Sequence, residues 1–237
     1  MAVTTTERTT TDRTATGNGS PPGRPRTSVA QTSRSRRTRH DLVEAVRADL
    51  RETGTFTAET VAARAECSAA TFYAHFGTKD AALTEAFTLV LEDLTALSAE
   101  SLSAERFGRF GCEQTVSEFV AAQTQFFATE SLAFRAAIER LPSHRPIRDA
   151  YRNAERVWMA QLVPTLADLV GAGLIDIQDI ETAAEALLVF GEGLNNPRLL
   201  RPDGDELRAV MAETMLAILK PTPTPPPPVS TKPTADT

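Results

Sequence analysis

The sequence predicts an all-α protein whose folded part lies between two unfolded ends. Between about residues 38 and 220, apolar residues recur three and four positions apart, and no convincing alternating strand is found. Residues 1–37 are rich in Thr, Ser, Arg, Gly and Pro and hold almost no large apolar side chains, so they cannot form a core. Over residues 221–237, consecutive prolines favour an extended, disordered tail.

Three short helices open the folded part. The apolar stripe of the first helix consists of Leu42, Val43, Val46 and Leu50. That helix should end at Gly54, whereas Thr57 and Ser68 are placed to cap a second and a third helix. Later amphipathic segments are expected over residues 80–97, 113–128, 131–139, 147–170, 180–194 and 204–219.

Charge is distributed unevenly along the chain. Residues 1–40 hold eight Arg against two acids, a net +6, whereas residues 41–220 hold 16 basic against 28 acidic residues, a net −12. A basic arm on an acidic body indicates that the arm meets a polyanion. Cys67 and Cys112 stand far apart, as is typical of reduced thiols in a cytoplasmic protein, and no clustered ligands indicate a metal or other cofactor.

Residues 57–83 describe a helix, a tight turn and another helix. Phe72 and Phe76 lie four positions apart and would anchor the third helix inward, so its opposite face stays open. A helix that enters a major groove with its N-terminus brings small side chains to base edges and hydroxyls to phosphates. The candidate DNA-contacting residues on this surface are Ala69, Ala70, Thr71, Tyr73, His75 and, at the start of the next helix, Lys79.

The same stretch closely resembles the signature of TetR-family transcriptional regulators, with Thr71-Phe72-Tyr73-Ala74-His75-Phe76 and then Lys79-Asp80 at its centre. The resemblance implies a helix-turn-helix DNA-binding domain over residues 38–83 and an effector-binding and dimerisation domain over residues 84–220. In that family the third helix reads the operator, and the aromatic and Lys positions hold phosphates. These roles are carried onto Thr71, Tyr73, His75 and Lys79.

One position departs from the family pattern, since Glu66 stands where Gly is usual in the turn. A non-glycine residue is strained there if the backbone needs a positive φ, and a negative charge near DNA weakens binding. Residues 41–83 hold four Lys or Arg against seven acids, which leaves a role for the basic arm.

The arm carries two groups of candidate DNA contacts. Gly23-Arg24-Pro25 resembles the core of an AT-hook, whose arginines lie in narrow minor grooves. Arg36, Arg37 and Arg39 precede the first helix stripe and are placed to reach the neighbouring groove. A merely solvated arm is the alternative.

Aromatic side chains concentrate in the middle helices, where Phe127, Tyr151 and Trp158 are expected to line a ligand pocket. Core packing is the alternative for most of these aromatic positions. The last two helices have wide apolar stripes that two copies could bury as a twofold four-helix interface, unless they are buried within one chain. The expected interface residues are Leu187, Phe190, Leu194, Met211 and Met215.

These features predict a cytoplasmic, homodimeric regulator of transcription, and repression is the commoner outcome in the family. A small apolar ligand would favour a spacing of the recognition helices that no longer fits a palindromic operator. Activation stays open, and the sequence does not indicate the effector, the operator or the regulated genes. The alternatives are a ligand-binding helical protein that no longer binds DNA and an adaptor acting through its proline-rich tail. An enzyme is disfavoured because no nucleophile, base and orienting group occur together.

Overall fold

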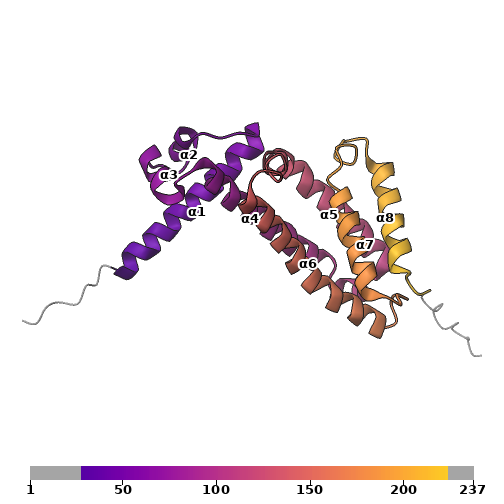
Figure 1. Ribbon diagram of the computed structural model, residues 1–237. Helices are drawn as coiled ribbons and strands as arrows, with labels where there is room; N and C mark the ends of the chain where they lie inside the picture. Colours follow the sequence, from indigo (N-terminus) through magenta and orange to yellow (C-terminus); the bar gives the residue numbers. More distant parts are fainter. Residues whose placement is uncertain (1–27, 224–237) are drawn as a thin grey trace, which may run out of the picture. The chain divides into compact units, whose positions relative to one another are not determined.

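The computed structural model describes residues 28–223, most of which lie in α-helices (Figure 1). The helices are α1 (Ser28–Thr53), α2 (Ala58–Arg64), α3 (Ala69–Phe76), α4 (Lys79–Ser101), α5 (Ala104–Ile138), α6 (Arg145–Gly171), α7 (Ile180–Gly193) and α8 (Asp205–Leu219). Within residues 28–223 the only β pairing is an isolated bridge between Ile175 and Pro221, so the all-α prediction is confirmed. None of the helices described is both long and apolar enough to span a membrane.

Two units are distinguished along the chain, residues 1–37 and residues 38–237. Of the first unit the structure describes only residues 28–37, which form the first turns of α1. The prediction that all of residues 1–37 are disordered is therefore wrong for these ten residues. From Ser28 to Thr53 no Gly or Pro interrupts the chain, and a helix propagates readily from turns already formed. Gly23-Arg24-Pro25 and residues 224–237 lie outside the described residues.

The second and third helices are held by the caps that their sequences predict. The Thr57 hydroxyl accepts a hydrogen bond from the Thr60 amide, and the Thr60 hydroxyl accepts one from the Thr57 amide. The Ser68 hydroxyl caps α3 by accepting from the Thr71 amide at 3.1 Å. Both helices are too short to be stable alone, so these caps and the packing against α1 define their ends.

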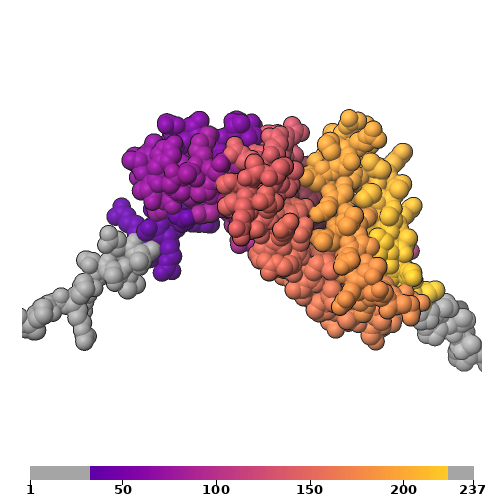
Figure 2. Space-filling view, in the orientation of Figure 1, coloured from indigo at the N-terminus to yellow at the C-terminus, as the bar shows by residue number. Residues whose placement is uncertain are grey.

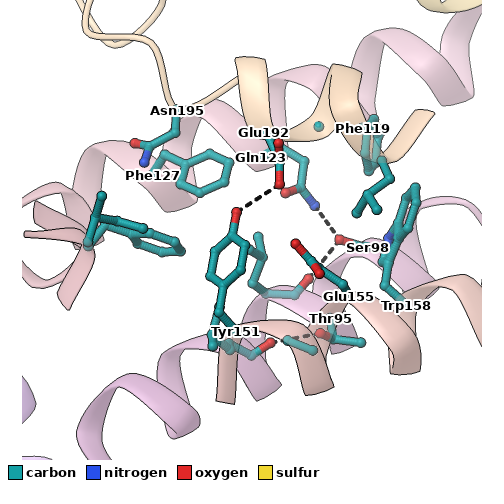
Figure 3. A pocket seen from close by; sticks show the side chains of 17 residues that line it. Thr95, Ser98, Phe119, Gln123, Phe127, Tyr151, Glu155, Trp158, Glu192 and Asn195 are labelled. Atoms are coloured by element: carbon teal, nitrogen blue, oxygen red, sulfur yellow. Dashed lines mark hydrogen bonds between the residues drawn. The ribbon is translucent and has the colours of Figure 1, made fainter. Parts of the chain in front are cut away.

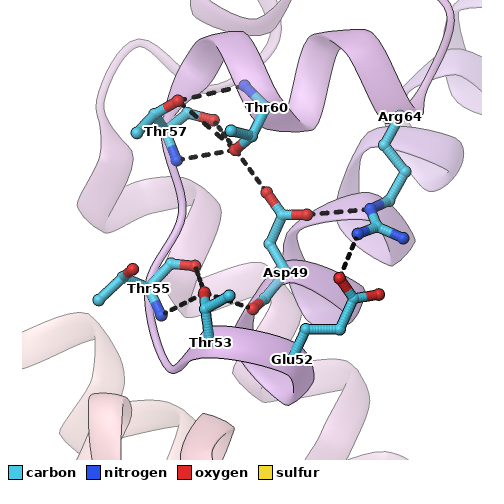
Figure 4. Close-up of polar contacts among 7 residues, drawn as sticks. All are labelled: Asp49, Glu52, Thr53, Thr55, Thr57, Thr60 and Arg64. Carbon is cyan, nitrogen blue, oxygen red and sulfur yellow. Dashed lines mark hydrogen bonds and ion pairs between the residues drawn. The ribbon is translucent and has the colours of Figure 1, made fainter.

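A buried carboxylate joins α1 to α2 (Figure 4). Asp49 accepts hydrogen bonds from the Thr60 hydroxyl at 2.5 Å and from Nε of Arg64 at 2.9 Å. A terminal nitrogen of Arg64 also binds Glu52 at 2.8 Å. The hydrogen bond to Glu52, followed by the one to Asp49, raises the pKa of Arg64. The first two helices therefore form one rigid support for the third.

The turn between α2 and α3 has a left-handed backbone, the case in which the sequence predicts strain at Glu66. Glu66 has φ 51°, and the Cys67 amide reaches back to the Ala62 carbonyl at 2.8 Å. This closing bond is the one that helices make when a left-handed residue ends them. Glu66 therefore adopts a left-handed conformation that favours glycine.

The remaining helices form the body, in which α4 packs against α5 and α6, α5 against α8, and α6 against α7. The sequence predicts two helices over residues 113–128 and 131–139, but α5 is continuous there and its break lies earlier, at Gly111 with φ 79°. Ala128, Thr129 and Glu130 supply no helix-breaking residue, which explains the continuity. The predicted domain boundary at residue 83 falls inside α4, so one helix belongs to both predicted domains.

A buried ion cluster ties the helix-turn-helix to the body. The side chain of Glu130 on α5 is 1% exposed, and one of its oxygens accepts from Arg47 Nε at 2.9 Å and from Arg51 Nε at 2.8 Å. Arg47 also pairs with Asp93 of α4 at 2.6 Å. Removing one partner of such a buried cluster leaves an uncompensated charge, at a cost of about 3–5 kcal/mol. α1 is thus fixed to both α4 and α5.

Candidate nucleic-acid interface and ligand cavity

One face of α3 is anchored and the other is open. Phe72 and Phe76 are buried, with their ring centres 5.0 Å apart, and Phe56 packs beside them. Tyr73 is 48% exposed although its ring meets Phe72 edge-on. Ala70 is exposed, and Ala69, Thr71 and His75 are half-buried. All six candidate residues are therefore at least partly accessible, and their contact with DNA stays a prediction.

One of the hydrogen-bonding side chains on this surface already has a partner, since the Thr71 hydroxyl lies 3.0 Å from that of Ser68. At His75 the backbone carbonyl, and not the imidazole, accepts a bond from Arg39. Tyr73 and Lys79 are the large polar side chains on this surface that are exposed.

Arg39 was expected to contact DNA, and the structure gives it a different role. Its guanidinium forms an ion pair with Glu85 of α4 and lies 5.1 Å above the ring centre of Phe76. The side chain thus braces α1 against α3 and α4, because a carboxylate stands where a phosphate was expected. Arg36 and Arg37 belong to the first of the two units, residues 1–37, and both side chains are exposed.

The positive charges of the helix-turn-helix are mostly neutralised within the protein. Arg39, Arg47, Arg51 and Arg64 are all paired with carboxylates. Lys79 is the only Lys or Arg in residues 38–83 without an ion pair; it is exposed at the first turn of α4, with its ammonium 5.0 Å from the ring centre of Phe56. The Thr78 hydroxyl caps this helix through the Ala81 amide, so Lys79 stands beside free amides at a helix N-terminus.

A cavity of about 120 Å³ lies among α4, α5, α6 and α7. A single water needs only about 10–15 Å³, so the space suits a small organic molecule. Phe127, Tyr151 and Trp158 all line it, as the sequence predicts, together with Phe119 and Phe134 (Figure 3). Aromatic and aliphatic side chains form most of the wall.

The cavity also holds polar groups that the sequence analysis did not single out. Glu155 and Glu192 line it, and the Tyr151 hydroxyl donates to Glu192 at 2.9 Å. Gln123 is buried and donates to the Ser98 hydroxyl at 2.9 Å. Burial, the hydrogen bond to Glu192 and the charge of that carboxylate raise the pKa of Tyr151, which remains a donor. The small apolar ligand predicted from the sequence would therefore meet two carboxylates in this wall.

The expected dimer residues are mostly inside the protomer. Leu187, Phe190, Leu194 and Met215 are buried, and Met211 is half-buried, since their stripes face α5 and α6. Burial within one chain, the alternative left open by the sequence, holds for these four. Val189 (67%) on α7 and Val210 (53%) and Leu207 on α8 are exposed. These two neighbouring helices, orange and yellow, lie at the surface in Figure 2.

Comparison with known proteins gives structural matches only. No family model matches the sequence, and no curated protein matches it. A TetR transcription regulator from Haloarcula marismortui superposes with a TM-score of 0.64 at 17% identity, over 79% of this chain and 100% of that one. A transcriptional regulator from a Rhodococcus species gives 0.59 at 22% identity, covering 78% and 99%.

A third match, a TetR-family regulator from Thermus thermophilus, gives a TM-score of 0.52 at 20% identity, over 76% of this chain and 97% of that one. The described chain therefore has the fold of TetR-family transcriptional regulators, as its helix-turn-helix signature implied.

The left-handed Glu66 generates a prediction with a matched control. Such a conformation costs a non-glycine residue roughly 1–2 kcal/mol, and the entropy of Gly in the unfolded chain offsets about half of this. Replacing Glu66 with Gly should therefore raise the free energy of unfolding by about 0.5–1 kcal/mol in urea titrations. Lys220, with φ 49° at the end of α8, should gain similarly from Lys220→Gly.

Only the change at Glu66 removes a negative charge beside α3, so only Glu66→Gly should also tighten DNA binding severalfold. A destabilised Glu66→Gly protein, or equal effects of both changes on DNA affinity, would contradict this interpretation of the turn.

Proposed function

We propose that this protein is a homodimeric transcriptional repressor that binds a palindromic operator and leaves it when a small organic molecule occupies the cavity. The observation that carries the proposal is the open face of α3, where Tyr73 extends into solvent while Phe72 and Phe76 anchor the back. A short helix held in this way, capped at its N-terminus and followed by an exposed Lys79, suits a major groove.

Tyr73 and Lys79 are assigned to phosphates, and the N-terminal turn of α3, with Ala69, Ala70 and Thr71, to base edges. Small side chains permit close approach, and an alanine methyl suits the thymine methyl group. His75 lies further along the same helix and is assigned to the edge of the contact.

The charge balance supports a role for residues that precede the helix-turn-helix. DNA affinity depends on cations that meet phosphates, yet Lys79 alone is unpaired among the Lys and Arg of residues 38–83. Arg36 and Arg37, which are exposed, and the arm that precedes them therefore supply the missing positive charge. The arm contributes sequence-independent affinity through phosphates, whereas α3 contributes specificity through base edges.

The exposed apolar side of α7 and α8 is assigned to the dimer interface. Val189 and Val210 are the two most exposed large apolar side chains in the described part of the chain. Ala186 and Gly193 share the Val189 stripe, and small residues allow close helix approach. Two copies of this helix pair form a four-helix contact with twofold symmetry, which matches a palindromic site.

The ion cluster gives the cavity a physical route to the DNA-binding surface. Phe127 and Phe134 line the cavity on either side of Glu130 along α5, and Glu130 holds Arg47 and Arg51 of α1. Leu91, Leu94 and Thr95 line it from α4, the helix that begins at Lys79. An occupant that shifts α4 against α5 therefore reorients the helix-turn-helix, and a ligand that prefers this state lowers operator affinity.

DNA binding is tested with the duplex upstream of the protein's own gene, measured by fluorescence anisotropy over a range of salt. Lys79→Ala should lower affinity and reduce the slope of log affinity against log salt by about 1.8, because a dimer loses one phosphate contact per protomer and each is worth about 0.9. The matched control Lys220→Ala should leave the slope unchanged. Thr71→Ala with Tyr73→Ala should lower affinity at least tenfold. Unchanged affinity in that double variant would exclude α3 as the reading helix and favour a ligand-binding protein without DNA function.

The dimer surface is tested by Val189→Asp combined with Val210→Asp. Two buried charges at a twofold interface would be unpaired, so the variant should run as a monomer in light scattering and lose operator affinity. Val157→Asp, at an exposed apolar position on α6, is the control and should remain dimeric. A dimeric double variant would place the interface elsewhere.

A further inference from the structure

We infer that the effector is an amphiphilic organic cation, with an apolar or aromatic body held by the rings of the cavity and an amine or related cationic group held between Glu155 and Glu192. This inference names the ligand class of the cavity, and the effector role that it assigns rests on the proposed function.

Glu155 is the residue that points to a cation. It lies on α6 between Tyr151 and Trp158, at positions i, i+4 and i+7, so all three line the cavity from one helix face (Figure 3). The residue is only partly exposed, yet its carboxylate has no hydrogen bond or ion pair with any residue in 28–223. A carboxylate placed against aromatic rings without a partner is unfavourable, and a cationic ligand would supply the partner.

A second carboxylate strengthens the same preference. Glu192 of α7 also lines the cavity, receives the Tyr151 hydroxyl and, among the described residues, has no ion pair. Burial and the charge of Glu192 raise the pKa of Glu155, whereas Arg152 acts in the opposite direction. Two carboxylates that disfavour each other's charge would both be stabilised by one cation between them.

The rest of the wall fits the other half of such a ligand. Phe119, Phe127, Phe134, Tyr151 and Trp158 present aromatic rings, which bind both apolar groups and cations; Trp is the strongest cation–π partner. No Lys or Arg is among the residues that line the cavity. An anionic ligand would meet two carboxylates and no Lys or Arg in the wall. A wholly apolar ligand would leave Glu155 without a hydrogen bond, whereas Glu192 already accepts one from Tyr151.

Three probes with one body and different head groups test the inference: 4-phenylbutylamine, 4-phenylbutanol and 4-phenylbutyrate, which are cationic, neutral and anionic at pH 7. Trp158 is the only tryptophan in the chain and lines the cavity, so intrinsic fluorescence of the full-length protein reports occupancy directly. The amine should bind at least tenfold more tightly than the alcohol, and the carboxylate more weakly than both.

The charge is then removed from the protein. Glu155→Gln should reduce the preference for the amine over the alcohol to less than threefold, because the amide that replaces the carboxylate carries no charge. Glu185→Gln, an exposed change on α7 outside the cavity, is the matched control and should keep the full preference. Equal binding of amine and alcohol, tighter binding of the carboxylate, no binding of any probe, or the same loss in both variants would overturn the inference.

Because this titration contains no DNA, it separates two failures. A protein that selects the amine but does not bind the operator duplex supports the ligand class and refutes the proposed repressor. A protein that binds the duplex without selecting the amine refutes the ligand class alone.

Discussion

The carboxylate of Glu130 is the contact on which the arrangement of this molecule depends. It lies inside the body on α5, and Arg47 and Arg51 of α1 both donate to the same oxygen. Its other oxygen is buried without a partner among the described residues, so the carboxylate has little freedom to exchange partners for water. A buried charge of this kind specifies one position of α1 relative to α5, because any other position leaves charges unpaired in a medium of low dielectric.

This constraint links the cavity to the proposed DNA-binding surface. The aromatic residues Phe127 and Phe134 lie one turn to either side of Glu130, so the α5 wall of the cavity and the anchor of α1 are one rigid segment. On α4, Asp93 also pairs with Arg47, and Asp80, near the start of that helix, pairs with Arg140 in the turn after α5. Packed helices joined by discrete ion pairs change between distinct arrangements instead of deforming continuously, which is the physical basis for a switch.

Much of the fold could be predicted from the sequence because local signals agree there. Thr57 and Ser68 cap helices, Phe72 and Phe76 share a helix face, and the turn residue Glu66 has the positive φ that its position requires. The fate of Arg39 could not be predicted in this way, since its partner Glu85 is 46 residues distant and both look like solvated charges. For the same reason the Glu130 cluster could not be predicted, because Arg51 and Arg47 are 79 and 83 residues away from Glu130 in the sequence.

The helix pair α7 and α8 and the cavity show where hydrophobicity alone predicts the wrong surface or misses a residue. On α7 and α8 the richer apolar stripe, with Leu187, Phe190 and Met215, fills the protomer core, and the sparser stripe with Val189 and Val210 faces outward. In the cavity, Tyr151 and Trp158 could be predicted because they are aromatic. Glu155 lies between them on α6 and could not be distinguished in the sequence from an ordinary surface residue.

Coupling between the cavity and the DNA-binding surface is tested most directly by measuring 4-phenylbutylamine affinity through Trp158 fluorescence with and without saturating operator duplex. Thermodynamic linkage requires that the duplex weaken amine binding by the same factor by which the amine weakens duplex binding, and we expect that factor to lie between about 5 and 150. Identical amine affinity in the free and the DNA-bound protein would contradict a ligand-released repressor.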